Sequence, residues 1–236
     1  MRRALLILVL ALALVAAGCG GSSDDATDTT TAATDTTSTD TGTTATVGAD
    51  GCTDVTVPEA RQDGGAKEPK ERLDPEKTYK LVFKTNCGSF TVTLDQAKAP
   101  ATSASLVSLA NDGFYDNTIF HRIVPGFVIQ AGDPTQSGSG GPGYTTVDPP
   151  PADSKYTEGV VAMAKTGAEP AGTSGSQFFV VSGPNAATLP PDYAIVGNVT
   201  SGMDTVKRID GFGDVNDPNG TPTRPVVIES VTVEES

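Results

Sequence analysis

Residues 120–133, which read FHRIVPGFVIQAGD, place two polar side chains beside an apolar run. Arg122 carries a guanidinium that stays charged at physiological pH and presents several fixed hydrogen-bond donors, and Gln130 offers an amide. Pro125 and Gly126 predict a bend between two strand-like pieces. The alternative interpretation is a core strand whose Arg122 side chain extends its head group to solvent. The segment is the main candidate for chemistry in this chain.

Other kinds of chemistry lack the residues that they need. His121 is the only histidine, so no histidine-based triad or zinc site can be assembled, and we interpret it as a partly buried polar neighbour of Arg122. The Gly-rich stretch 138–143 lacks the GK[ST] ending of a phosphate-binding loop, and we expect a flexible loop there. The acidic residues are scattered rather than set at metal-loop spacing. We therefore expect no metal and no cofactor.

Short strands and two helices are predicted around this segment. Apolar residues alternate with polar ones over residues 79–94, interrupted by Asn-Cys-Gly, which predicts a β-hairpin. A helix is predicted from Pro100 to about Gly113, with an apolar stripe, and a shorter one over residues 201–211. Residues 227–233 resemble a strand. Many short strands with Gly and Pro between them predict one all-β domain, a barrel. The apolar stripe of the first helix consists of Leu106, Val107, Leu109 and Ala110.

The first 18 residues have the three parts of an export signal. Two arginines precede an apolar run that is shorter than the roughly 20 residues needed to span a bilayer, and small residues follow it. Cys19 comes next, an arrangement that resembles a bacterial lipobox, in which the cysteine is lipidated and becomes the new N-terminus. Ala16 departs from that pattern, which more often has leucine. The alternative is an ordinary cleaved signal with an incidental cysteine.

Three further segments follow the signal. Residues 19–51 are rich in Thr, Asp, Ser, Ala and Gly and contain no aromatic residue, so we expect a lipidated Cys19 followed by a disordered linker. The linker threonines could alternatively be glycosylated. Residues 52–78 form a polar lead-in, and residues 79–234 form the folded domain.

The charge balance limits the possible partners. The chain has 16 basic and 29 acidic residues, with a formal net charge of −13. A polyanion would be repelled, and no basic stripe with interleaved aromatic residues is present, so we expect no nucleic acid. An anionic membrane surface would repel the chain as well, so membrane contact would come only through acyl chains. We expect an extracytoplasmic, lipid-anchored protein of the cell envelope.

Cys52 and Cys87 are the other two cysteines. Because an exported chain meets an oxidising compartment, we predict a disulfide between them that ties the lead-in to the first hairpin. The alternative is two separate thiols, with Cys87 simply a turn residue.

Three segments in order resemble the motifs of cyclophilins. They are residues 120–133, then SGSQFFVV at residues 174–181, then LPPDYAIVGNV at residues 189–199. The resemblance covers about residues 79–234. It implies a closed antiparallel eight-stranded β-barrel capped by two α-helices, and peptidyl-prolyl cis/trans isomerase activity on X-Pro bonds.

The resemblance also implies a role for each residue of the site. Arg122 matches the catalytic arginine. Tyr193 stands where many members have histidine, and Lys165 stands where the family usually has asparagine, so its charge could bias substrate choice toward acidic flanks. The segment from Lys165 to Gln177 is also longer than usual, which leaves its shape unpredicted. The substrate-binding residues implied are Phe127, Val128, Gln130, Ala164, Lys165, Gln177, Phe179, Leu189 and Tyr193.

The implied reaction needs no covalent chemistry. Rotation about a peptide bond is opposed by a barrier of roughly 18–20 kcal/mol, and a guanidinium against the prolyl nitrogen would favour the twisted state. The implied partners are proline-containing polypeptides, whose folding after export the chain would assist, and we expect a monomer. The main alternative is a module that binds proline-containing segments with incidental or no catalysis. A structural protein that uses the barrel as a spacer is a third.

Overall fold

The computed structural model describes residues 47–236. This part of the chain contains one large and one small antiparallel sheet, two α-helices and one 3-10 helix. The predicted signal peptide, Cys19 and most of the predicted linker lie outside the described residues. The elements, in chain order, are β1 (Tyr79–Thr85), β2 (Gly88–Leu94), α1 (Pro100–Asn111), β3 (Thr118–Ile119), β4 (Arg122–Val124), β5 (Val128–Ala131), β6 (Thr146–Val147), β7 (Val160–Met163), β8 (Thr173–Ser174), β9 (Phe178–Val181), η1 (Pro184–Thr188), β10 (Ile195–Ser201), α2 (Met203–Asp210) and β11 (Val227–Glu235).

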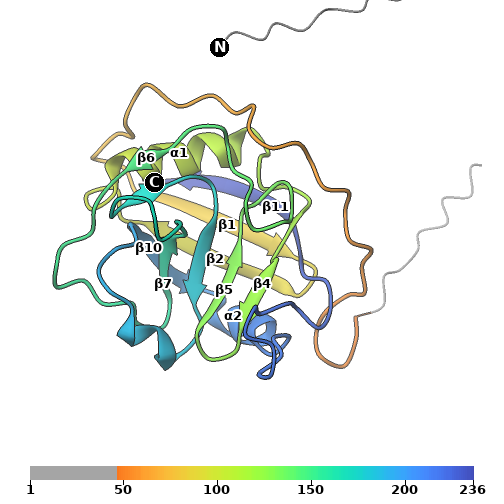
Figure 1. Ribbon diagram of the computed structural model, residues 1–236. Helices are drawn as coiled ribbons and strands as arrows, with labels where there is room; N and C mark the ends of the chain where they lie inside the picture. Colours follow the sequence, from red (N-terminus) through yellow and green to blue (C-terminus); the bar gives the residue numbers. More distant parts are fainter. Residues whose placement is uncertain (1–46) are drawn as a thin grey trace, which may run out of the picture. The chain divides into compact units, whose positions relative to one another are not determined.

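The large sheet has the strand order β3-β11-β1-β2-β10-β7-β9-β5-β4, and every pair in it is antiparallel. It curls into a half-barrel with α1 and α2 at opposite ends (Figure 1). The strand pairs within residues 47–236 do not by themselves confirm the predicted closed eight-stranded barrel. The reason is that residues 118–124 change partner: β3 pairs with β11 on one side, and β4 pairs with β5 on the other. Phe120 donates its N–H to Val226 O at the point of change, so one continuous run becomes two short edge strands.

The predicted hairpin is confirmed as β1 and β2. Alternate residues of β1 are buried, as the period of two requires, and Phe83 stacks on Phe90 directly opposite, with ring centroids 4.7 Å apart. The predicted final strand is also confirmed, because β11 pairs with β1 from Ile228 to Glu235. β11, β1 and β2 therefore lie side by side in the large sheet, between β3 and β10.

Both predicted helices are confirmed, but α1 differs in its burial. Nine of its residues are buried, among them Thr102, Ser103 and Ser105, which lie outside the predicted apolar stripe. The loop that follows β5 covers this second face: Asp148 accepts hydrogen bonds from the backbone and the hydroxyl of Thr102, and Tyr144 bonds to Ser105. Because the Thr and Ser side chains on this face are small, the segment after β5 can pack closely against the helix. No helix within residues 47–236 is long and apolar enough to cross a membrane.

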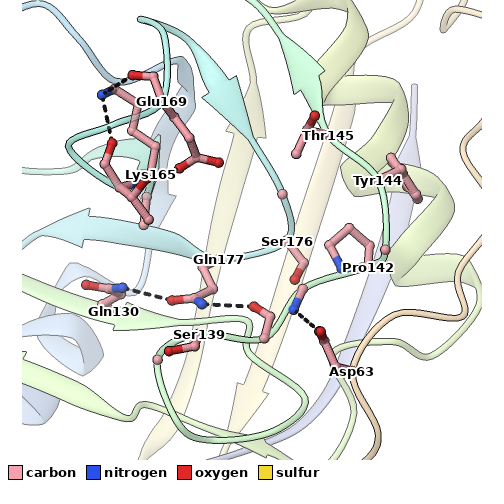
Figure 2. Close-up of a pocket in the computed structure, with 17 residues that line it drawn as sticks. Asp63, Gln130, Ser139, Pro142, Tyr144, Thr145, Lys165, Glu169, Ser176 and Gln177 are labelled. Carbon is pink, nitrogen blue, oxygen red and sulfur yellow. Dashed lines mark hydrogen bonds between the residues drawn. The ribbon is translucent and has the colours of Figure 1, made fainter. Parts of the chain in front are cut away.

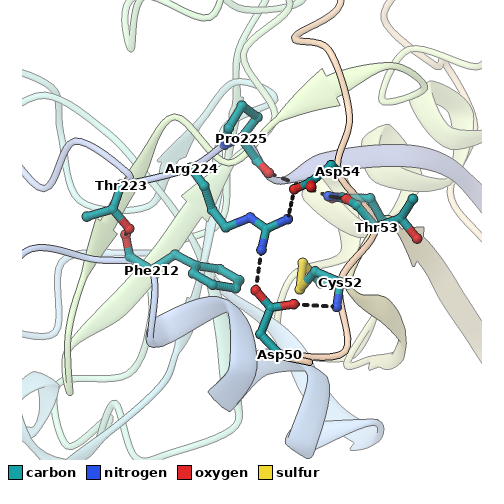
Figure 3. A network of polar contacts seen from close by, with 10 residues as sticks. Asp50, Cys52, Thr53, Asp54, Phe212, Thr223, Arg224 and Pro225 are labelled. Carbon is teal, nitrogen blue, oxygen red and sulfur yellow. Dashed lines mark hydrogen bonds and ion pairs between the residues drawn. A yellow bond between two sulfur atoms is a disulfide. The ribbon is translucent and has the colours of Figure 1, made fainter. Parts of the chain in front are cut away.

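The lead-in is attached to the domain at its first residues. Cys52 and Cys87 form a disulfide at the turn between β1 and β2. Arg224, which precedes β11, pairs with Asp50 and Asp54 and lies 5.0 Å from the centroid of the Phe212 ring (Figure 3). The chain then runs along the outside of the domain toward α1 (Figure 1).

Candidate functional site

The strand register separates the two faces of β4, β5, β9 and β7. One row of directly opposed residues lies in the main core, and the neighbouring row lies on the opposite face, because side chains alternate along a strand. The core row is Ile123, Ile129, Val180 and Val161. The opposite row is Arg122, Gln130, Phe179 and Ala162. The motif of alternating polar and apolar residues therefore presents Arg122 and Gln130 together, away from the core.

The turn between β4 and β5 places Phe127 at the edge of this row. Pro125 and Gly126 occupy the two central positions, Phe127 donates its N–H to Val124 O, and Gly126 has a φ of 69°, a conformation that favours glycine. The bend predicted from Pro-Gly is confirmed. The carboxylate of Asp210, at the end of α2, accepts the N–H of Gly126 at 3.0–3.1 Å and the hydroxyl of Ser182 at 2.6 Å. A helix end thus fixes the turn.

A second apolar cluster, separate from the main core, covers this face. Val128 and Phe179 are among its buried members, and five partly exposed residues pack against them: Phe127, Ala164, Leu189, Tyr193 and Ile195. Phe179 and Tyr193 meet edge to face, with ring centroids 5.5 Å apart. The residues predicted from the sequence that meet in this cluster are Phe127, Val128, Ala164, Phe179, Leu189 and Tyr193.

Tyr156 supports this cluster and was missed in the sequence. It is fully buried, its hydroxyl donates to Tyr193 O at 2.8 Å, and it accepts the N–H of Tyr193 at 2.9 Å. Burial raises the pKa of the Tyr156 hydroxyl. Because these bonds go to the backbone, nothing in the residue type of Tyr193 indicates its partner, and only the isolated Tyr156 in a polar stretch could have drawn attention.

The two predicted glutamines are joined in a chain of amides. Gln130 Nε2 donates to Gln177 Oε1 at 3.0 Å, and Gln177 Nε2 donates to the carbonyl of Gly140 at 2.9 Å (Figure 2). Both amide groups are therefore fixed in orientation. Within residues 47–236 no group donates to Gln130 Oε1, which leaves that oxygen as an acceptor for a bound peptide.

Asp133 organises the Gly-rich loop that carries Gly140. Its carboxylate accepts hydrogen bonds from the N–H groups of Thr135, Gly138 and Gly140 at 2.6–3.2 Å and from the Thr135 hydroxyl. Burial alone would raise the pKa of Asp133, but these donors hold it below its ordinary value. The expectation of a flexible loop at residues 138–143 was wrong, because a buried carboxylate binds its backbone. An Asp ahead of successive small residues was the available signal.

Lys165 lies beside the cluster, and its ammonium group forms an ion pair with Asp192. Its side chain is only 2% exposed, and its Nζ lies 2.6 Å from Asp192 and 5.6 Å from the centroid of the Tyr193 ring. It also donates to the carbonyl of Glu169 at 3.0 Å. The suggestion that its charge biases substrate choice toward acidic flanks finds no support in this geometry. The long segment after Lys165 closes on itself, because Glu169 accepts the N–H and hydroxyl of Thr166.

Arg122 makes no ion pair and no side-chain hydrogen bond with any of residues 47–236. Its neighbour His121 has both ring nitrogens buried without a hydrogen-bond partner in the same range. Burial lowers the pKa of His121, and the nearby Arg122 lowers it further while Asp133 opposes the change. The imidazole is therefore neutral at pH 7, whereas the guanidinium of the adjacent Arg122 carries a charge.

A cavity of about 610 Å³ adjoins the amide chain. Four residues of the predicted site belong to its wall, and the Gly-rich loop forms the opposite side (Figure 2); the four are Gln130, Ala164, Lys165 and Gln177. Within residues 47–236 no group of three or more His, Cys, Asp or Glu side chains is arranged to hold a metal ion.

Comparison with known proteins assigns the chain to a family. The sequence profile described as cyclophilin type peptidyl-prolyl cis-trans isomerase/CLD matches residues 80–233. A peptidyl-prolyl cis-trans isomerase-like 1 of Aspergillus oryzae is 40% identical over 159 residues, which cover 66% of this chain and 96% of the relative. The chain belongs to the cyclophilin family.

Two further comparisons extend over the same cyclophilin domain. A probable peptidyl-prolyl cis-trans isomerase A of Mycobacterium leprae is 37% identical over 166 residues, which cover 63% of this chain and 88% of the relative. The crystal structure of a cyclophilin type peptidyl-prolyl cis-trans isomerase of Cryptosporidium parvum superposes with a TM-score of 0.60 at 29% identity, covering 66% of this chain and 98% of that chain. The same protein in the presence of the dipeptide Ala-Pro also has a TM-score of 0.60, at 30% identity.

The cyclophilin domain brings together the residues predicted for its site. Arg122 and Gln130 face the same side, Gln177 bonds to Gln130, and the apolar cluster lies in the next strands of the same face. Lys165 lies at the edge of this group and points to Asp192 instead. Cys52 and Cys87 lie elsewhere, at the turn of the first hairpin.

Proposed function

We propose that this chain catalyses the cis/trans isomerisation of X-Pro peptide bonds in proteins that have been exported. The observation that carries the proposal is the Arg122 guanidinium, which has no ion-pair or hydrogen-bond partner among residues 47–236 and lies on the same face as an oriented amide and an apolar cluster with a partly exposed rim. The likeness to the Cryptosporidium parvum protein studied with Ala-Pro supports proline-containing polypeptides as substrates.

The mechanism follows from the position of each group. The apolar cluster, with Phe127 and Phe179, would hold the pyrrolidine ring and exclude water, which strengthens electrostatic interactions nearby. Gln130 Oε1 would accept a backbone N–H of the peptide. The Arg122 guanidinium would donate to the prolyl nitrogen as it becomes pyramidal, and would therefore stabilise the twisted amide more than either planar form. No bond is made or broken.

A protease-coupled assay on a proline tetrapeptide tests this function. The uncatalysed reaction takes tens to hundreds of seconds, so an acceleration at micromolar enzyme is measured directly. If the peptide binds in titration calorimetry but isomerises at the uncatalysed rate, the chain is a proline-peptide binding module instead.

We further propose that the mature chain is a lipoprotein, with residues 1–18 removed, Cys19 acylated and residues 19–46 serving as a linker to the cell membrane. The export signal and the position of Cys19 support this, and the disulfide is in keeping with an oxidising compartment outside the cytoplasm. Intact-mass analysis of the membrane fraction should find the chain beginning at an acylated Cys19, and Cys19→Ala should release it. An unmodified N-terminus would contradict the proposal.

We also propose that the domain of residues 79–234 acts as a monomeric closed barrel of eight strands, with β3 and β4 as one interrupted strand. Only residues 120 and 121 separate them, and they are the two edges of the large sheet. Amide hydrogen exchange of Phe120 and of both edge strands should then be as slow as in the centre of the sheet. Rapid exchange at these positions would indicate an open edge, and sedimentation analysis tests the monomer.

A further inference from the structure

The lead-in and the few residues before it contact both the first hairpin and the Gly-rich loop of the site. We call residues 47–66 the strap. Its first part is fixed by the disulfide of Cys52, by the ion pairs of Arg224, and by Thr53, which exchanges hydrogen bonds with Asn86 (Figure 3). The strap therefore leaves the first hairpin from a fixed position.

The second part of the strap lies along the loop that Asp133 organises. Arg61 donates its N–H to Pro134 O at 2.8 Å, Gly64 donates to Gly141 O at 3.0 Å, and Ala66 donates to Pro142 O at 3.1 Å. The two backbones approach so closely that a Cβ on Gly143 would lie 3.1 Å from Gly64 Cα, and Gly143 has a φ of 91°. The contact is thus built from backbone groups of both segments.

Asp63 is the side chain through which the strap holds the loop. Its Oδ1 accepts the N–H of Gly141 at 2.7 Å (Figure 2). The preceding residue, Gly140, donates its N–H to Asp133, and its carbonyl accepts a hydrogen bond from Gln177. Two carboxylates therefore hold the loop, Asp133 from within the domain and Asp63 from the strap. Both bonds lie next to the Gly140 carbonyl, which orients the amides of Gln177 and Gln130.

We propose that Asp63 is a positioning residue of the isomerase site, acting through Gly141 and Gly140 on the orientation of Gln177 and Gln130. The proposal rests on the proposed function. A glycine-rich stretch has large conformational freedom, so each bond that restricts it narrows the positions of the Gly140 carbonyl. Asp63 touches no reacting atom, and its effect appears in peptide binding rather than in the chemical step.

Substitution at Asp63 separates positioning from charge. Asp63→Ala should raise KM for a proline tetrapeptide about threefold to tenfold, as expected for losing one hydrogen bond, with kcat within about twofold. Asp63→Asn keeps the acceptor oxygen and should restore KM to near the wild-type value. Glu59→Ala is the matched control, because it removes the same charge from an exposed residue of the same strap and should change neither constant.

A double-mutant cycle distinguishes this role from a general loss of structure. In the Gln177→Ala background, where the amide chain is already broken, Asp63→Ala should raise KM by less than about twofold. Equal effects in both backgrounds, or an unchanged KM in Asp63→Ala, would overturn the proposal. Titration calorimetry with the same peptide gives Kd for every variant, so the positioning role is tested even if the wild-type chain shows no turnover and the proposed function fails.

Discussion

Lys165 and Tyr193, the two positions at which this chain departs from the usual cyclophilin pattern, contact each other. The ammonium of Lys165 lies 5.6 Å from the centroid of the Tyr193 ring and 2.6 Å from Asp192. An aromatic ring beside a buried cation is favourable. The two departures therefore form one unit that shapes the edge of the apolar cluster, which could not be seen from either position alone, because their contact depends on how two distant loops meet.

The buried ring of His121 gives a prediction about pH. Burial lowers its pKa below the ordinary value of 6.5, so the unfolded chain binds a proton that the folded chain does not. The contribution of His121 to stability is therefore present above about pH 6.5 and is lost as the pH falls below it. Urea unfolding of the wild type should show a decline between pH 7 and pH 5 that is smaller in His121→Gln.

Isomerase activity should not follow this decline while the protein remains folded. Neither a guanidinium nor an amide changes its charge between pH 5 and 8. A bell-shaped profile of kcat/KM in this range, controlled by His121, would mean that the imidazole takes part in the reaction.

At the scale of elements, α2 and the turn between β4 and β5 work together. Asp210 ends the helix and accepts hydrogen bonds from Gly126 and Ser182, so the helix fixes the turn that presents Phe127. Asp210→Ala should lower the free energy of unfolding by about 1–3 kcal/mol, because it removes hydrogen bonds to a charged group and leaves donors without partners. Peptide affinity should fall as well, since Phe127 would be less well positioned.

Chemical denaturation and calorimetric titration measure these two effects. Asp204→Ala is the control on the same helix, because the side chain of Asp204 is 79% exposed and lies 4.0 Å from Arg208. If Asp210→Ala were as stable as that control, the helix would not be fixing the turn.

The elements themselves were largely predictable from the sequence, because their signals are local. The period of two gave the hairpin of β1 and β2, and proline and glycine marked the ends of α1. The second buried face of α1 was not predictable, because Tyr144 and Asp148, which bond to its hydroxyl groups, lie on either side of β6, a strand of only two residues without a periodic pattern. The break between β3 and β4 was missed for a similar reason, since it depends on a change of partner strand.

At the scale of the whole molecule, the strap joins the first hairpin to the loop beside the site. The sequence indicated a pairing of Cys52 with Cys87 from their number and compartment, and the structure places them in a disulfide. Where the strap runs afterwards could not be predicted, because its contacts are mostly backbone hydrogen bonds that any polar sequence can make. Asp63 is an example, since no residue near it in the sequence indicates that its carboxylate accepts a hydrogen bond from Gly141.

Removing the disulfide should destabilise the domain. The bond closes a loop with a sequence separation of 35 residues, for which the chain-entropy estimate is about 3–4 kcal/mol. Urea unfolding of the Cys52→Ser/Cys87→Ser variant should show that loss relative to the oxidised wild type. The reduced wild type should resemble the variant, and equal stability of the oxidised and reduced wild type would show that the bond adds nothing.

The most direct test of the catalytic account is the kinetic effect of substitutions at Arg122. Arg122→Ala should lower kcat/KM by about 100-fold or more, the loss expected for one strong electrostatic stabiliser of a transition state, while the Kd for the same peptide changes little. Arg122→Lys should also lose most of the activity, because it keeps the charge without the planar donor array. Near wild-type turnover in Arg122→Ala would contradict the mechanism, even in a correctly folded cyclophilin domain.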